Sequence, residues 1–267
     1  MMKGRALLFG LNYEKTDCEL RGCINDVINM GAYINKNLKF PTKVCIDPES
    51  TKGIAMVQSL YELAIQSHTE SLECVFIHYS GHGSYTIDQS RDEADGRDEC
   101  LVPSDYMTAG LIPDDLLEKL FRYFNPKTRV IFICDACHSG TICDLKWSWA
   151  MTQAVKLPTS KPQALNLMIP TVENVNCMIT AKVITISGCM DDQTSADAFN
   201  VLGDGKFSGA LTSCLLKVLA DPAAAFAARS NVFVLIAYLT ASLTSNGFPQ
   251  RPKLCSTYDL SHDRKFV

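Results

Sequence analysis

Two polar clusters carry the residue types of nucleophilic catalysis, and each cluster follows an apolar run. Residues 78–83 (HYSGHG) follow the run 73–77, and residues 135–140 (DACHSG) follow the run 129–134. A thiolate can attack a carbonyl carbon while an imidazole transfers protons, and backbone N–H groups beside glycines can stabilise the oxyanion that forms. Since open α/β sheets bind ligands at the carboxyl ends of their strands, the two clusters predict a thiol active site at neighbouring strand ends.

Other uses of the same residues are less favoured. Cys134 to His138 fits the C-x-x-C-H pattern of c-type haem attachment, but that chemistry needs an export context. A redox pair of Cys134 and Cys137 would place one thiol inside an apolar strand, where thiols are usually inert. His78 and His82 have the spacing of a zinc helix without its Glu, and Gly81 disfavours a helix there. The same segment lacks the third glycine of a dinucleotide loop, and the chain has no G-K-[ST].

The acidic residues are concentrated in one window. Residues 88–118 contain ten acids and two bases, a charge of −8 within a chain of −4, so the rest of the chain is +4. A charge run of this kind is commonly a solvated surface. The alternative is a hard-cation site, since Ca²⁺ binds six to eight oxygen ligands, many of them from Asp and Glu. No EF-hand pattern is present.

Composition excludes several broad classes. The chain has 267 residues, a net charge of −4, and 15 Gly and 11 Pro, which is neither collagen-like nor of low complexity. The small net charge gives no case for a nucleic-acid or membrane partner, and no apolar run approaches the ~20 residues of a membrane span. We find no secretory signal and expect the twelve cysteines to be reduced thiols in a cytoplasmic protein.

The elements that must position the two clusters alternate between strand and helix. Five short apolar runs predict buried strands of a parallel sheet, at 5–11, 43–47, 73–80, 129–135 and 182–188. Three- and four-residue apolar spacing predicts helices at 26–38, 54–65, from Pro113 onward, 208–219 and 232–243. The fold class is therefore α/β: a three-layer sandwich with a mostly parallel sheet of about six to eight strands and helices on both faces.

We expect a single domain over 1–267. Residues 147–181 have three prolines and no glycine and keep neither period, so they predict a linker or surface excursion. This linker would separate a first part, 1–146, from a second part, 182–267.

The chain resembles the metacaspases, a family of the caspase-like cysteine peptidase clan. The resemblance rests on HYSGHG and DACHSG together, and extends through LLFGLNY (7–13), LRGCIND (20–26), DGRDE (95–99) and SGCMDDQTSAD (187–197). The order of the two parts and the short linker are similar to type I members, although the N-terminal extension that many of those carry is absent. The resemblance implies a caspase-like fold and a largely monomeric peptidase acting on protein or peptide substrates.

The resemblance also implies catalytic roles at matching positions. Cys137 would be the nucleophile and His82 its partner, which protonates the leaving amine. The amides of Gly83 and Cys137 would form the oxyanion hole.

A basic specificity follows from the same resemblance. Asp26, Ser80 and Asp135 would line the primary pocket and select Arg or Lys at the cleavage site. The physics agrees, because a buried carboxylate is costly unless it meets a cation. Asp26 could instead be a helix N-cap or a first-turn acid.

Calcium and self-processing complete the expectation. Many metacaspases need Ca²⁺, and the matching ligand positions are Asp98, Asp114, Asp115 and Asp144. Asp114 and Asp115 could instead cap a helix. Self-cleavage in the linker would follow Lys156 or Lys161, with Lys156 favoured because Pro162 follows Lys161.

We thus expect a calcium-activated cysteine endopeptidase that cleaves after Arg or Lys. The alternatives are a catalytically silent metacaspase-like scaffold that binds partners, or a thiol-redox module on a similar sheet.

Overall fold

A computed structural model of the chain describes residues 2–87, 96–137, 142–151, 168–172, 174–188, 197–199, 202–203 and 205–267. In chain order its elements are β1 (Gly4–Gly10), α1 (Cys23–Asn37), β2 (Thr42–Cys45), α2 (Gly53–Thr69), β3 (Cys74–Ser80), β4 (Gly83–Ile87), β5 (Arg97–Leu101), α3 (Tyr106–Ala109), β6 (Ile112–Pro113), α4 (Asp114–Phe121), β7 (Arg129–Asp135), β8 (Trp147–Met151), β9 (Met168–Val172), β10 (Lys182–Ser187), β11 (Asp197–Phe199), β12 (Phe207–Gly209), α5 (Ala210–Ala220), α6 (Pro222–Ser230), α7 (Val232–Ser245) and β13 (Lys253–Ser256).

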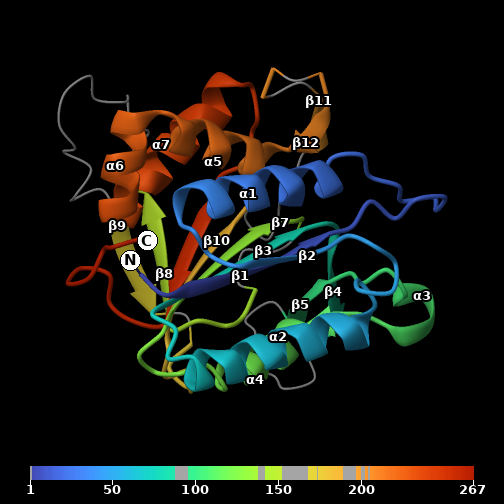
Figure 1. The fold of residues 1–267 in the computed structure, drawn as a ribbon, viewed down its shortest axis with the longest axis horizontal. Coiled ribbons are helices and arrows are strands. Elements are labelled where there is room, and N and C mark those ends of the chain that lie inside the picture. The colour runs from blue at the N-terminus through green and yellow to red at the C-terminus, as the bar shows by residue number, and fades with distance from the viewer. Residues whose placement is uncertain are drawn as a thin grey trace.

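The central sheet has eight strands in the order β2-β1-β3-β7-β10-β13-β8-β9 (Figure 1). The five strands β2, β1, β3, β7 and β10 pair with one another in parallel, and these are the five strands that the apolar runs predicted. β13, β8 and β9 extend the sheet in antiparallel pairs. The predicted α/β class with a mostly parallel sheet is confirmed.

Helices cover both faces of the sheet (Figure 1), and side chains of the inner parallel strands β1, β3, β7 and β10 alternate between two cores. Leu8 of β1 packs in the core with Val27 of α1 and Leu211 of α5. Its neighbour Phe9 packs in the opposite core with Leu60 of α2. The strands therefore read as continuous apolar runs in the sequence, since neither face meets water.

The three C-terminal helices lie on the same side of the sheet as α1 (Figure 1). In the described part of the chain no single helix is long and apolar enough to cross a bilayer. α5 and α6 reach that length and composition only as a pair, bent by 106° at their junction.

Two expectations differ from the structure. β2 is an edge strand with Lys43 and Val44 exposed, so it is not buried on both faces as predicted. The expected linker contains regular structure: β8 at its start and β9 within it are antiparallel strands of the main sheet. β9 is exposed at four of its five residues, so it has no continuous apolar run to mark it in the sequence.

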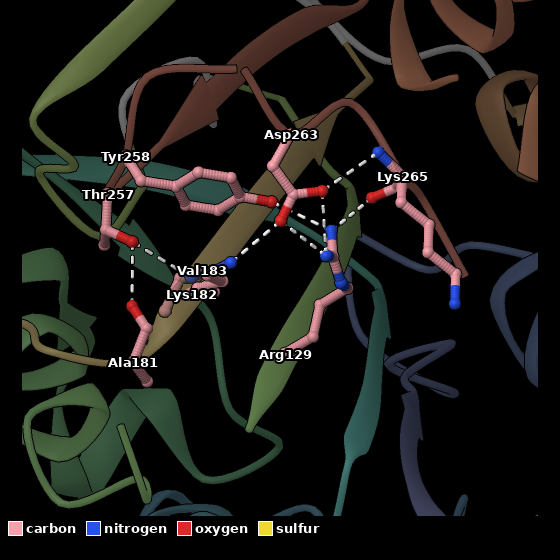
Figure 2. Close-up of polar contacts among 8 residues, drawn as sticks. All are labelled: Arg129, Ala181, Lys182, Val183, Thr257, Tyr258, Asp263 and Lys265. Carbon is pink, nitrogen blue, oxygen red and sulfur yellow. Dashed lines mark hydrogen bonds and ion pairs between the residues drawn. The ribbon is translucent and has the colours of Figure 1, made fainter. Parts of the chain in front are cut away.

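A polar clamp joins the C-terminal segment to the first residues of β7 and β10 (Figure 2). These residues lie at the opposite end of the parallel strands from the two clusters. Arg129, which begins β7, donates to the Asp263 carboxylate at 2.8 and 3.1 Å, to the Tyr258 hydroxyl at 2.9 Å and to the Lys265 carbonyl. Lys182, which begins β10, donates to Asp263 at 2.9 Å. Desolvation raises the pKa of Asp263, but the hydrogen bonds and charges of Lys182 and Arg129 outweigh it and hold that pKa below its usual value. The clamp ties both parts of the chain together.

Candidate active site

The two polar clusters lie side by side at one edge of the sheet, as their strand-end positions predicted. Ser80 at the end of β3 is in register with Asp135 at the end of β7. The N–H of Gly81 donates to the Asp135 carbonyl at 3.3 Å. The segments that carry His82 and Cys137 therefore leave the sheet from neighbouring strands.

Gly83 and Cys137 are in very close backbone contact. A Cβ on Gly83 would lie 1.7 Å from the Cys137 carbonyl oxygen and 2.9 Å from its carbonyl carbon. Only glycine allows that approach. Cys137 is half-buried, whereas Cys134 inside β7 has no exposed surface, so only one thiol of the C-x-x-C pair can meet a substrate.

The His82 imidazole is anchored at one ring nitrogen. Its Nε2 lies 2.6 Å from the carbonyl oxygen of Cys18, and because a carbonyl only accepts, Nε2 carries the hydrogen. The Tyr13 ring packs against the imidazole at a centroid distance of 4.7 Å. In the neutral ring, Nδ1 is then the nitrogen that can take up a proton.

Two buried tyrosines hold the backbone of His82. The His82 N–H donates to the Tyr13 hydroxyl at 3.0 Å, and that hydroxyl donates to the Val102 carbonyl at 2.7 Å. The Tyr79 hydroxyl accepts from the Val102 N–H at 3.2 Å and donates to the His82 carbonyl at 2.7 Å. Burial raises the pKa of both phenols well above the usual value, so both remain hydrogen-bond donors.

Beside this edge, two buried carboxylates border a single glycine. Asp26 is 1% exposed and Asp135 is 4% exposed. A Cβ on Gly209 would lie 2.8 Å from Asp26 Oδ2 and 2.2 Å from Asp135 Oδ2. The Ser80 hydroxyl donates to Asp26 Oδ2 at 2.6 Å. The structure thus brings together all three residues predicted for the specificity pocket.

The N-terminus of α5 supplies N–H donors to both carboxylates. Gly209 N–H lies 3.0 and 2.9 Å from the two oxygens of Asp26. Thr212 donates its N–H and its hydroxyl to Asp135 Oδ2, each at 2.8 Å. A helix N-terminus stabilises negative charge. Asp26 lies in the first turn of α1, whose N-cap is Gly22, so it is a first-turn acid of that helix, as the alternative allowed, and not its N-cap.

Three acidic side chains of the former charge window are buried together. Asp98, Glu99 and Asp114 are 7, 5 and 2% exposed. Burial, followed by the charges of Asp114, Asp98 and Glu99, raises the pKa of the Cys100 thiol to about 12. Burial, and then the hydrogen bond and charge of Glu99, raise the pKa of Asp114 well above its usual range. The sequence did not single out Glu99.

The other two predicted calcium ligands have contacts of their own. Asp115 forms an ion pair with Lys119 at 3.1 Å, one turn later in α4. Asp144 has a left-handed backbone (φ 45°), and its carbonyl accepts from Asn174. Across the residues that the structure describes, no group of three or more His, Cys, Asp or Glu side chains is arranged to hold a metal ion, and calcium binding stays a prediction. Two further predicted residues, the self-cleavage sites Lys156 and Lys161, lie outside the described residues.

Comparisons with known proteins agree with this arrangement. Residues 4–146 match the family model described as metacaspase, peptidase C14 domain. Metacaspase-1B of Aspergillus terreus is 30% identical, covering 98% of this chain and 77% of its own length. The chain belongs to the metacaspase family. Metacaspase-1 of Kluyveromyces lactis is 28% identical over 98% of this chain and 68% of its own.

A solved structure supports the fold alone. A crystal structure of a Geobacter sulfurreducens protein superposes with a TM-score of 0.63 and 24% identity, covering 98% of this chain and 97% of its own.

The family model and the curated relatives confirm the resemblance to metacaspases that the motifs indicated, and the protein is a cysteine peptidase.

Several residues of this metacaspase site had no signal in the sequence. The Cys18 carbonyl and the N–H groups of Gly209 and Thr212 act through the backbone, which every residue type supplies. Tyr13 and Tyr79 stand in matching motifs, but their hydroxyls meet only because β1 and β3 are neighbours in the sheet.

Proposed function

We propose that this metacaspase is an endopeptidase that cleaves after Arg or Lys. The observation that carries the proposal is the pair of buried carboxylates, Asp26 and Asp135, beside the Cys137 segment. Two acids that border one glycine concentrate negative charge there, which would suit a guanidinium or ammonium group and repel a carboxylate. His82 and Cys137 at the same edge of the sheet are consistent with a thiol peptidase.

The proposed reaction proceeds through Cys137. Its sulfur attacks the scissile carbonyl carbon, the C–S bond forms, and the carbonyl electrons move to oxygen. The amides of Gly83 and Cys137 donate to that oxyanion. The thiol proton passes to Nδ1 of His82, which is anchored through Nε2. When the tetrahedral intermediate collapses, the carbonyl re-forms, the scissile C–N bond breaks, and that proton goes from Nδ1 to the leaving amine. Water then hydrolyses the thioester and restores the thiol.

The test of specificity uses matched substrates. Fluorogenic peptides ending in Arg, Lys, citrulline or Asp are compared, since citrulline has the shape of Arg without its charge. Asp135→Asn and Asp26→Asn should each lower kcat/KM for the Arg peptide by about 10- to 100-fold, the equivalent of one charged hydrogen bond. Glu49→Gln, which removes an exposed acid elsewhere, is the control variant. Comparable cleavage of the Asp and Arg peptides by the wild type would refute the acidic pocket.

Calcium dependence is a separate part of the proposal. It rests on the family and on the buried acids Asp98, Glu99 and Asp114, whose mutual repulsion a divalent cation would relieve. Asp98→Asn should weaken the calcium response, whereas Glu49→Gln should leave it unchanged. Equal peptidase activity in calcium and in chelator would refute calcium activation and leave the specificity proposal standing.

Self-processing is the last part of the proposal. We expect a calcium-dependent cut after Lys156 in the wild type, absent in Cys137→Ala and reduced in Asp98→Ala. Lys156→Gln should block it, and Lys161→Gln is the matched control. Mass spectrometry of the chain after calcium addition identifies the new terminus. A fully active chain that stays intact would show that the cut is dispensable.

A further inference from the structure

His78 is a fully buried histidine for which the peptidase reaction has no use. It lies on β3, two residues before Ser80, and has no exposed surface. Its Nε2 lies 3.0 Å from Thr212 Oγ1, while its Nδ1 finds no hydrogen-bond partner among the described residues. A buried ring nitrogen without a partner destabilises the fold, and an apolar side chain would avoid that cost. The use of histidine here must therefore depend on the contact of Nε2.

Hydrogen-bond directions link that contact to Asp135. A carboxylate only accepts, so the Thr212 hydroxyl donates its single hydrogen to Asp135 Oδ2 at 2.8 Å. The hydroxyl can then only accept from His78, which requires a hydrogen on Nε2. This tautomer leaves Nδ1 without a hydrogen, in agreement with its lack of a donor or acceptor partner. Burial also lowers the pKa of His78 to about 3, so the ring is neutral.

This chain of hydrogen bonds, from His78 through Thr212 to Asp135, forms a relay that favours one side-chain rotamer of Thr212. A threonine in a helix divides between two χ1 rotamers, because its hydroxyl can turn back to a carbonyl of the preceding turn. The Nε2–H of His78 favours the rotamer in which the hydroxyl of Thr212 faces Asp135. Asp135 Oδ2 is then held by two donors from one residue, the N–H and the hydroxyl.

We infer that His78 is a positioning residue for substrate recognition, which acts through Thr212 to hold the Asp135 carboxylate in place for a cationic substrate side chain. The inference rests on the proposed specificity for Arg and Lys. His78 touches neither the substrate nor the reacting atoms, so its effect should appear in recognition of charge rather than in reactivity of the thiol.

The test is a double-mutant cycle with the Arg and citrulline peptides. Thr212→Val keeps the shape and the N–H but removes the hydroxyl, and should lower the Arg-to-citrulline ratio of kcat/KM by about tenfold, mainly through KM. His78→Leu should lower the same ratio by a similar factor. In the Thr212→Val background, His78→Leu should have no further effect, because the relay is already broken. The rate of Cys137 alkylation by iodoacetamide should stay within about twofold of wild type throughout.

Conservative variants keep the test decisive if His78→Leu does not fold. His78→Gln places an amide N–H near the position of Nε2 and should retain the ratio, whereas His78→Asn reaches only the Nδ1 position and should lose it. A wild type that prefers Arg, together with an unchanged ratio in His78→Asn and Thr212→Val, would overturn the inference alone. Additive effects in the double variant would also overturn it. A wild type without preference for Arg over citrulline would instead refute the proposed function.

Discussion

The contact between Gly83 and Cys137 makes a single methyl group a severe perturbation. In Gly83→Ala the new Cβ would lie 1.7 Å from the Cys137 carbonyl oxygen, while ordinary contacts begin at 3.4 Å. The two segments would have to separate by about 1.7 Å, and a backbone carbonyl cannot rotate away as a side-chain end can. A misplacement of about 1 Å at reacting groups costs about 100-fold in rate, so we expect kcat to fall by at least that factor.

The assay must separate lost geometry from lost folding. Peptidase kcat is measured with the Arg peptide, and thermal unfolding is followed on the same samples. Overpacking should lower the free energy of unfolding by about 1–3 kcal/mol, which leaves most of the protein folded at 25 °C. Gly31→Ala is the matched control, since its Cβ in α1 would meet Val44 only at 3.4 Å and should leave kcat unchanged. A Gly83→Ala enzyme with kcat within about threefold of wild type would refute this account of the strand ends.

Four other variants test three separate features. Cys137→Ala should abolish peptidase activity, whereas Cys134→Ala, a change inside the buried strand, should keep most kcat and lose about 1–3 kcal/mol of stability in urea unfolding. Tyr13→Phe keeps the ring on His82 but removes the hydroxyl that accepts from the His82 N–H. It should lower the free energy of unfolding by about 1–3 kcal/mol and lower kcat by the factor equivalent to that energy. Unchanged values would show that the hydroxyl is dispensable. Asp263→Asn should destabilise by about 1–2 kcal/mol at pH 7, and since the folded-state pKa of this acid lies below its unfolded value, the difference should disappear as the pH falls through that folded-state pKa.

Four of the five parallel strands could be predicted because they are almost wholly buried. β3, for example, has all seven residues buried and begins with the apolar run 74–77. β9 has one buried residue in five and β8 has two, so local sequence does not distinguish either from an irregular segment. Their pairing depends on β13, which lies about a hundred residues further along the chain.

The residues of the site also divide into those that the sequence predicts and those that it does not. The two clusters that carry His82 and Cys137 could be placed together because strand ends of a parallel sheet meet at one edge, whereas the predicted pocket roles of Ser80 and Asp135 came from the resemblance to metacaspases. Where a group acts through its backbone, as the Cys18 carbonyl does, or through a long-range side-chain contact, no residue type marks it. The calcium ligands stay a prediction, because carboxylate positions in a sequence do not say which way each side chain points.

The pocket carboxylates and the donors that stabilise them belong to different parts of the chain. Asp26 and Asp135 precede the segment 152–167, and Gly209 and Thr212 follow it. A cut in that segment would leave the pocket intact, because β10 remains paired between β7 and β13 and the clamp from Arg129 to Asp263 holds the C-terminal end (Figure 2). Removal of everything after the cut, by contrast, would leave two buried acids without the N-terminus of α5, so each would gain a proton or turn outward. The second part of the chain would therefore be required for the proposed recognition of a cation, even though the residues predicted to react all lie in the first.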